Sequence, residues 1–168
     1  CCSHDQRQVA PVTMASVFSG FGSGEEALRA SQCGFTVMAA EQQPTLRAHL
    51  EEKLSKTAQV LPSAKEFLEK SVRRSAQLLQ SSPPCPSRST VDLFRQGNLD
   101  KFGGLHWQDS ADYVLKVLPA NEWLECTNGV LRSTKGHASP MTLLKAAVQH
   151  LYWVTVLVLD AGRTASPA

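Results

Sequence analysis

A short apolar strand, followed at once by a glycine-rich turn and a helix, constrains this chain more than any other feature. Residues 13–18 are typical of a buried strand, residues 19–24 carry three glycines, and residues 25–30 favour a helix. Glycines let the backbone approach a ligand closely, and a helix N-terminus offers free N–H groups. This order is typical of the first unit of a βαβ fold that binds a nucleoside or dinucleotide.

A second strand is predicted over residues 35–40, and it ends at Glu41. A carboxylate at this place suits a ribose, because it can accept hydrogen bonds from two hydroxyl groups. Without a strand before it, Glu41 would be an ordinary carboxylate at the start of a helix. The glycine turn and the acid that ends the next strand together predict a nucleoside site.

A cysteine held between prolines follows a later apolar run. Residues 82–87 read Ser-Pro-Pro-Cys-Pro-Ser, and the prolines favour extended backbone, so Cys85 should lie on a stiff loop at a strand end. The carboxyl ends of strands are where α/β sheets bind ligands. A thiolate at this place can act as a nucleophile; the alternative is a turn that happens to contain a cysteine.

A brief strand over residues 122–124 ends in another carboxylate, Glu125, before a glycine turn. If the strands are parallel neighbours, Cys85 and Glu125 emerge at one edge of the sheet, beside the first glycine turn. A nucleophile and an acid would then face one pocket. The alternative for Glu125 is a solvated turn residue, which is the commoner fate of a single glutamate.

Strands and helices alternate along the rest of the chain. Helices are predicted over residues 45–54 (with Pro44 at the start), 64–74, 109–118 and 141–151, and further strands over residues 76–80 and 153–158. In the last helix, the residues expected to face the core are Leu143, Leu144, Ala147 and Leu151. Residues 87–105 show little periodicity and are expected to form a long mobile loop. The alternation predicts a parallel sheet with helices on both faces, an α/β fold of three layers.

Composition fits one globular domain. A chain of 168 residues can bury a core, and 42% hydrophobic and 19% charged residues are ordinary values. A net charge of +2 does not by itself indicate a nucleic-acid binder. Five cysteines without a C-x-x-C pair predict reduced thiols in an intracellular protein, with no disulfide framework and no metal site. No apolar run is long enough to span a membrane, and no signal sequence is evident.

Taken in order, these stretches resemble the cytosine-C5 DNA methyltransferase family. The family's first motif, a strand followed by Phe-x-Gly-x-Gly, is matched by Phe18, Gly20 and Gly22. Its ribose-binding acid is matched by Glu41. The resemblance implies S-adenosylmethionine as the cofactor, with Phe18 on its adenine, Glu41 on its ribose and the two glycines along its tail.

The catalytic motifs of the family are matched in part. Its Pro-Cys motif is matched by Pro84 and Cys85, and its Glu-Asn-Val motif by Glu125 alone. Residues 158–167 are similar to the strand and turn before the family's Gln-x-Arg-x-Arg motif. The resemblance implies that Cys85 adds to C6 of cytosine while Glu125 donates to N3.

This sequence also departs from the family's pattern. Ser16 stands where an acid usually opens the first motif, and Ser23 stands at the third glycine. Pro86 replaces the glutamine after the cysteine, and Cys126 and Thr127 replace the asparagine and valine of the glutamate motif. We therefore expect S-adenosylmethionine to bind more weakly than in a complete family member.

The resemblance implies a domain organisation and a function. Residues 1–12 would form an N-terminal extension, and residues 13–168 a Rossmann-like methyltransferase domain, incomplete at its C-terminus, without the target recognition domain. The implied activity is that of a DNA (cytosine-5-)-methyltransferase, with DNA as the partner and a nuclear location in a eukaryote or a cytoplasmic one in a bacterium. Three alternatives stay open: a tRNA cytosine-C5 methyltransferase, a catalytically inactive cofactor-binding relic, and a Rossmann dehydrogenase.

Overall fold

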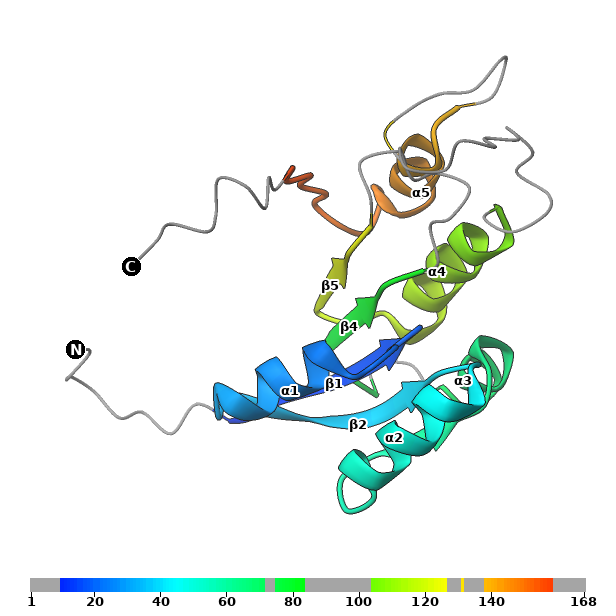
Figure 1. Cartoon of the computed structure of the whole chain (residues 1–168). Coiled ribbons are helices and arrows are strands. Elements are labelled where there is room, and N and C mark those ends of the chain that lie inside the picture. The colour runs from blue at the N-terminus through cyan, green and yellow to red at the C-terminus, as the bar shows by residue number, and fades with distance from the viewer. Residues whose placement is uncertain (1–9, 72–74, 84–103, 127–130, 132–137, 159–168) are drawn as a thin grey trace, which may run out of the picture.

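The computed structural model of the chain is built on a parallel sheet (Figure 1). It describes residues 10–71, 75–83, 104–126, 131 and 138–158. Within these residues the sheet has five strands in the order β3-β2-β1-β4-β5, and every neighbouring pair is parallel. The strands are β1 (Val12–Val17), β2 (Gly34–Ala40), β3 (Gln59–Leu61), β4 (Leu78–Ser81) and β5 (Asn121–Leu124).

A helix follows each strand. The helices are α1 (Ser23–Ala30), α2 (Pro44–Leu54), α3 (Ala64–Lys70), α4 (Gly104–Val117) and α5 (Pro140–Val148). Local signals set several of their starts, because Pro44 fits the first turn of α2 and the Ser63 hydroxyl accepts the backbone N–H of Glu66 at 3.1 Å. No helix in the described ranges is both long and apolar enough to cross a membrane.

The helices cover both faces of the sheet. On one face, Ala39 of β2 packs with Leu50 of α2. Its neighbour Ala40 points to the other face and belongs to a core cluster with Phe67 of α3 and Leu144 of α5. Because parallel crossovers are right-handed, a chain that runs from β1 out to β3 and returns through β4 places its later helices on the opposite face. The predicted three-layer α/β arrangement is therefore confirmed.

Most element boundaries agree with the sequence prediction. Helix α2 begins at Pro44, as expected, and α4 begins earlier than residue 109, at Gly104. Helix α3 ends at Lys70, before the predicted residue 74, because Ser71 is extended and its hydroxyl donates to the carbonyl of Phe67 at 2.6 Å. Part of the predicted mobile loop, residues 87–103, lies outside the described residues.

Two predictions near the C-terminal end are wrong. Residues 153–158 do not form a strand: they make no ladder with a described strand, and they line a cavity beside β5 instead. In α5, Leu144 is buried but Leu143 is 52% exposed, because Leu144 and Val148 form the inward row. Leu151, at 50% exposure, lies beyond the end of the helix.

An acidic side chain is buried at the outer strand of the sheet. The Oε1 atom of Glu122 on β5 is buried and has no hydrogen-bond partner among the described residues. Burial disfavours the charged form and raises the pKa of Glu122 to about 8. The carboxyl group is therefore mostly protonated at neutral pH.

This raised pKa predicts how stability depends on pH. The folded pKa of Glu122, about 8, lies above its ordinary value of 4.5, so the folded state loses stability as the pH rises from 4.5 towards 8. We expect Glu122→Gln to remove this loss. The free energy of unfolding of the variant, relative to that of the wild type, should be higher at pH 8 than at pH 4.5 by on the order of 3 kcal/mol. Urea unfolding at the two pH values measures the difference.

Glu52→Gln, on the exposed surface of α2, is the matched control and should leave the pH dependence unchanged. Parallel stability profiles for the wild type and Glu122→Gln between the two pH values would contradict the assignment of the buried acid.

Candidate active site

The carboxyl ends of four strands meet at one edge of the sheet. Residues just after three of these strands donate their backbone N–H groups to the last residue of a neighbouring strand: Ser19 N to Ala40 O at 3.1 Å, Ser82 N to Val17 O at 3.2 Å, and Glu125 N to Ser81 O at 3.0 Å. The strand order reverses between β1 and β4, and such a switch point is where open α/β sheets bind ligands. The glycine turn, Glu41 and Glu125 therefore lie along this edge.

The turn after β1 has an unusual backbone. Phe18, Gly20 and Gly22 all have left-handed φ angles of 60°, 57° and 77°. This conformation is uncommon for a bulky side chain such as that of Phe18, and strain of this kind gathers at ligand sites. A Cβ at Gly20 would meet no described atom within 4 Å, so a ligand can approach the backbone there.

Glu41 links this turn to the start of α2. Its Oε2 accepts the backbone N–H of Gly20 at 2.8 Å, and its Oε1 accepts that of Gln43 at 2.8 Å. The side chain is half-buried, and each carboxylate oxygen keeps further accepting capacity. Two hydroxyl groups of a ribose can therefore bind to Glu41 without displacing these backbone contacts.

A second acid, which the sequence reasoning missed, lies inside the turn. Glu25 of α1 is 4% exposed, and its Oε1 accepts the hydroxyl of Ser16, which in turn lies 2.6 Å from that of Ser19. The Oε2 atom of Glu25 is buried without a hydrogen-bond partner in the described part of the chain. A carboxylate from the helix thus reaches the strand position where Ser16 replaces the usual acid. The only feature of the sequence that could have indicated this contact is a glutamate nine residues after Ser16.

Gly24 follows Ser23, which stands at the third glycine of the motif that the sequence resembles. Ser23 is exposed at the start of α1, whereas a Cβ at Gly24 would lie 1.7 Å from Oε1 of Gln80 on β4. Gly24 therefore allows the close approach of α1 to the sheet, which is the role of the third glycine in such turns. The departure at Ser23 does not open a gap between helix and sheet.

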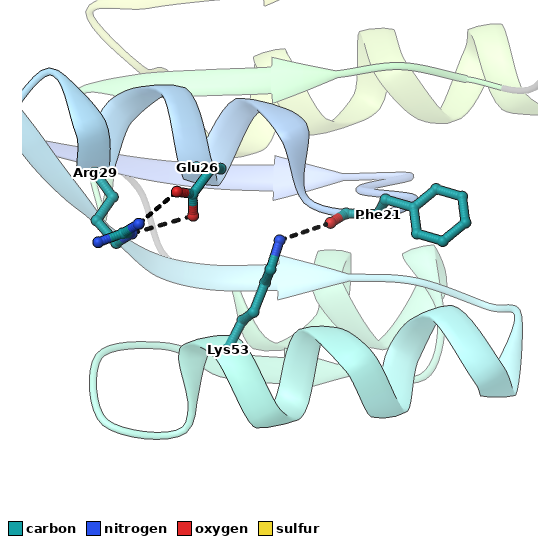
Figure 2. A network of polar contacts seen from close by, with 4 residues as sticks. All are labelled: Phe21, Glu26, Arg29 and Lys53. Atoms are coloured by element: carbon teal, nitrogen blue, oxygen red, sulfur yellow. Dashed lines mark hydrogen bonds and ion pairs between the residues drawn. The ribbon is translucent and has the colours of Figure 1, made fainter.

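Two polar contacts lie near the turn, one from α2 to the turn and one within α1. Figure 2 shows Lys53 of α2 donating to the carbonyl of Phe21 at 3.5 Å, and Arg29 paired with Glu26 on α1. The ring of Phe21 is 69% exposed and points out beyond the strand ends. It forms a T-shaped contact with His49. Phe21 can therefore contact a planar ligand ring, whereas Phe18, the predicted adenine contact, is half-buried against the core.

The two predicted catalytic residues are only partly described. Glu125 is exposed at the same edge as the glycine turn, and the described chain leaves β4 there as far as Pro83. Cys85 lies outside the described residues. Cys126 is disulfide-bonded, so the expectation of reduced thiols is wrong at this position. The odd cysteine count and the lack of a C-x-x-C pair carry no information on a bond between residues distant in sequence.

The Dnmt2 methyltransferase of S. pombe matches with a TM-score of 0.54 and 14% sequence identity, over 83% of this chain and 40% of that chain. The chain has a Rossmann-like methyltransferase fold. It spans less than half the length of the Dnmt2 chain that it matches.

A protein from Thermoplasma acidophilum, provisionally assigned as a methyltransferase, matches at 10% identity over 71% of this chain and 46% of that chain. Its TM-score of 0.45 is too low to carry an argument. No family model and no curated protein matches the sequence.

Alanine substitutions at the two glycines with left-handed φ angles should differ in their cost to stability. Gly20→Ala should cost about 1 kcal/mol of unfolding free energy, because only the left-handed φ opposes a Cβ there. Gly22→Ala should cost more, about 2 kcal/mol, since its Cβ would also lie 2.7 Å from Cδ2 of Leu50. Chemical denaturation measures both values. Equal losses would show that the turn does not pack on α2.

Proposed function

We propose that this chain is a methyltransferase domain that binds S-adenosylmethionine at the turn after β1 and acts on C5 of cytosine in DNA. The observation that carries the proposal is the position of Glu41, whose carboxylate contacts the backbone of the open glycine turn at Gly20. A nucleoside ribose on Glu41 would place its attached groups along that turn and beside the switch point. The fold shared with the Dnmt2 methyltransferase supports this reading.

The residues present fit this cofactor. Glu41 can accept the ribose hydroxyls, and the exposed ring of Phe21 can contact the adenine. Glu25 supplies the buried carboxylate of the turn that Ser16 lacks, and its unpartnered Oε2 favours a positively charged neighbour. When bound, S-adenosylmethionine supplies an electrophilic methyl group.

The chain's own residues would prepare the cytosine. The Cys85 thiolate adds to C6, which raises electron density at C5; once C5 carries the methyl group, solvent water takes the C5 proton and the C6–S bond breaks to release the thiolate. Glu125 donates a proton to N3 as negative charge develops on the ring. The base must leave the helical stack to reach these groups, which costs a few kcal/mol.

Cofactor binding is the first test of this proposal. Glu41→Ala removes the ribose acceptors and leaves the N–H groups of Gly20 and Gln43 without their carboxylate. We expect it to weaken S-adenosylmethionine binding by about tenfold or more in calorimetric titration. Glu52→Ala, on the exposed face of α2, is the control and should leave the affinity unchanged. Binding of NAD in place of S-adenosylmethionine would favour the dehydrogenase alternative instead.

The second test addresses the nucleophile. DNA that carries 5-fluorocytosine should trap a covalent complex in the presence of cofactor, because fluorine cannot leave C5 as a proton does. Cys85→Ser should abolish trapping, whereas Cys33→Ser, which changes an exposed free thiol, should not affect it. Glu125→Gln should slow trapping by about tenfold or more, since an amide is a poorer proton donor than a carboxylic acid.

The outcome separates the alternatives. Trapping on tRNA but not on DNA would replace the proposed substrate with RNA. A chain that binds S-adenosylmethionine and DNA but traps neither substrate would be a catalytically inactive relative.

A further inference from the structure

Glu25 of α1 carries a buried carboxylate whose charge has no partner in the described chain. The side chain is 4% exposed, and its Oε2 atom has no hydrogen-bond partner among the described residues. None of the ion pairs between described residues includes Glu25. A buried acid without a partner is costly, and each such atom in a folded protein calls for an explanation. A ligand that brings a positive charge would lower this cost.

The unpartnered oxygen lies close to the open glycine turn. Oε2 of Glu25 is 3.6 Å from the position that a Cβ would take at Gly22. Two residues earlier, at Gly20, the corresponding position has no described atom within 4 Å, so a ligand can approach the backbone there. Charges in a protein interior act over several ångströms, because the effective dielectric constant is low. The carboxylate can therefore act on a ligand in the turn without touching it.

Two serine hydroxyls extend from Glu25 towards the turn. Ser16 donates its only hydroxyl hydrogen to Oε1 of Glu25. In the 2.6 Å hydrogen bond between the hydroxyls of Ser16 and Ser19, Ser19 must therefore be the donor. The oxygen of Ser19, which directly precedes Gly20, is left with lone pairs alone and can only accept from a further group. This order of hydrogens favours a ligand group that donates, such as an ammonium.

The same arrangement disfavours a negatively charged group at the turn. A dinucleotide places its pyrophosphate against the start of the helix that follows such a turn. Here the first turn of α1 already carries Glu25 and Glu26, where a helix favours negative charge. Lys53 donates to the carbonyl of Phe21 at the exposed side of the turn, where solvent screens its charge. The charges therefore favour a cationic ligand tail over a pyrophosphate.

We propose that Glu25, Ser16 and Ser19 make the turn selective for a nucleoside whose tail carries a positively charged amino group. Ser19 accepts a hydrogen bond from the ammonium. Glu25 is a positioning residue: it acts through Ser16, fixes the direction of the hydrogen bonds and supplies the opposite charge. The inference rests on the proposed function, since S-adenosylmethionine carries such an amino group on the amino acid joined to its nucleoside.

Two ligands that differ in one amino group test the inference. S-adenosylhomocysteine carries the amino group, and its desamino analogue keeps the nucleoside, the sulfur and the carboxylate but lacks it. In calorimetric titration we expect the wild type to bind S-adenosylhomocysteine more tightly by about tenfold or more. Glu25→Gln keeps the size and an acceptor for the Ser16 hydroxyl but removes the charge. It should lower the preference by about fivefold.

Three further variants control this comparison. Glu26→Gln changes the next residue, which is paired with Arg29 at the surface, and should leave the preference unchanged. Ser16→Asp added to Glu25→Gln moves the carboxylate onto β1, within reach of the Ser19 hydroxyl, and should restore the preference. Ser19→Ala leaves Glu25 in place and should also lower the preference, so it provides the same comparison if Glu25→Gln does not fold.

Two results would overturn the inference and leave the proposed function in place. The first is a wild type that binds the two ligands equally well. The second is a Glu25→Gln variant that loses affinity for both ligands by the same factor, because a purely structural residue would not distinguish them. A folded wild type that binds neither ligand would instead contradict the proposed function, and the inference would fall with it.

Discussion

The parallel pairing of β1 with β2 on one side and β4 on the other is the constraint on which the rest of this structure depends. Because the chain runs from β1 to β2 and β3 before it returns to β4, the strand order reverses between β1 and β4, beside the glycine turn. Right-handed crossovers then place the early and late helices on opposite faces. The site therefore lies where the order of strands reverses, and its place follows from topology.

Two carboxylates from different elements hold the turn in its strained form. Glu41, after β2, accepts the backbone N–H of Gly20, and Glu25, on α1, accepts the hydroxyl of Ser16 beneath the turn. The Glu41 contact helps to hold a turn in which Phe18, a bulky residue, has a left-handed φ angle. Glu25 thus places a carboxylate beside Ser16, and Gly24 allows a close approach beside Ser23.

The outer strand β5 differs from the carboxyl ends of the strands, where the candidate site lies. At the site, carbonyl oxygens at the ends of neighbouring strands accept the backbone N–H groups of Ser19, Ser82 and Glu125, whereas the outer strand β5 keeps the neutral acid Glu122 beside a cavity. The polar groups proposed to bind a ligand thus lie at the carboxyl ends of the strands, and the buried acid lies at the outer strand.

The sequence by itself determined the elements whose signals act over a few residues. A glycine turn directly after an apolar run predicted the βαβ opening, Pro44 marked the start of α2, and an acid after the second strand placed Glu41 at the turn. Only the tertiary structure decided the strand order, the reach of Glu25 to Ser16 and the absence of a strand over residues 153–158. The reason is physical: a strand exists only when a partner supplies its hydrogen bonds, and that partner is distant in sequence, so composition cannot reveal whether it is present.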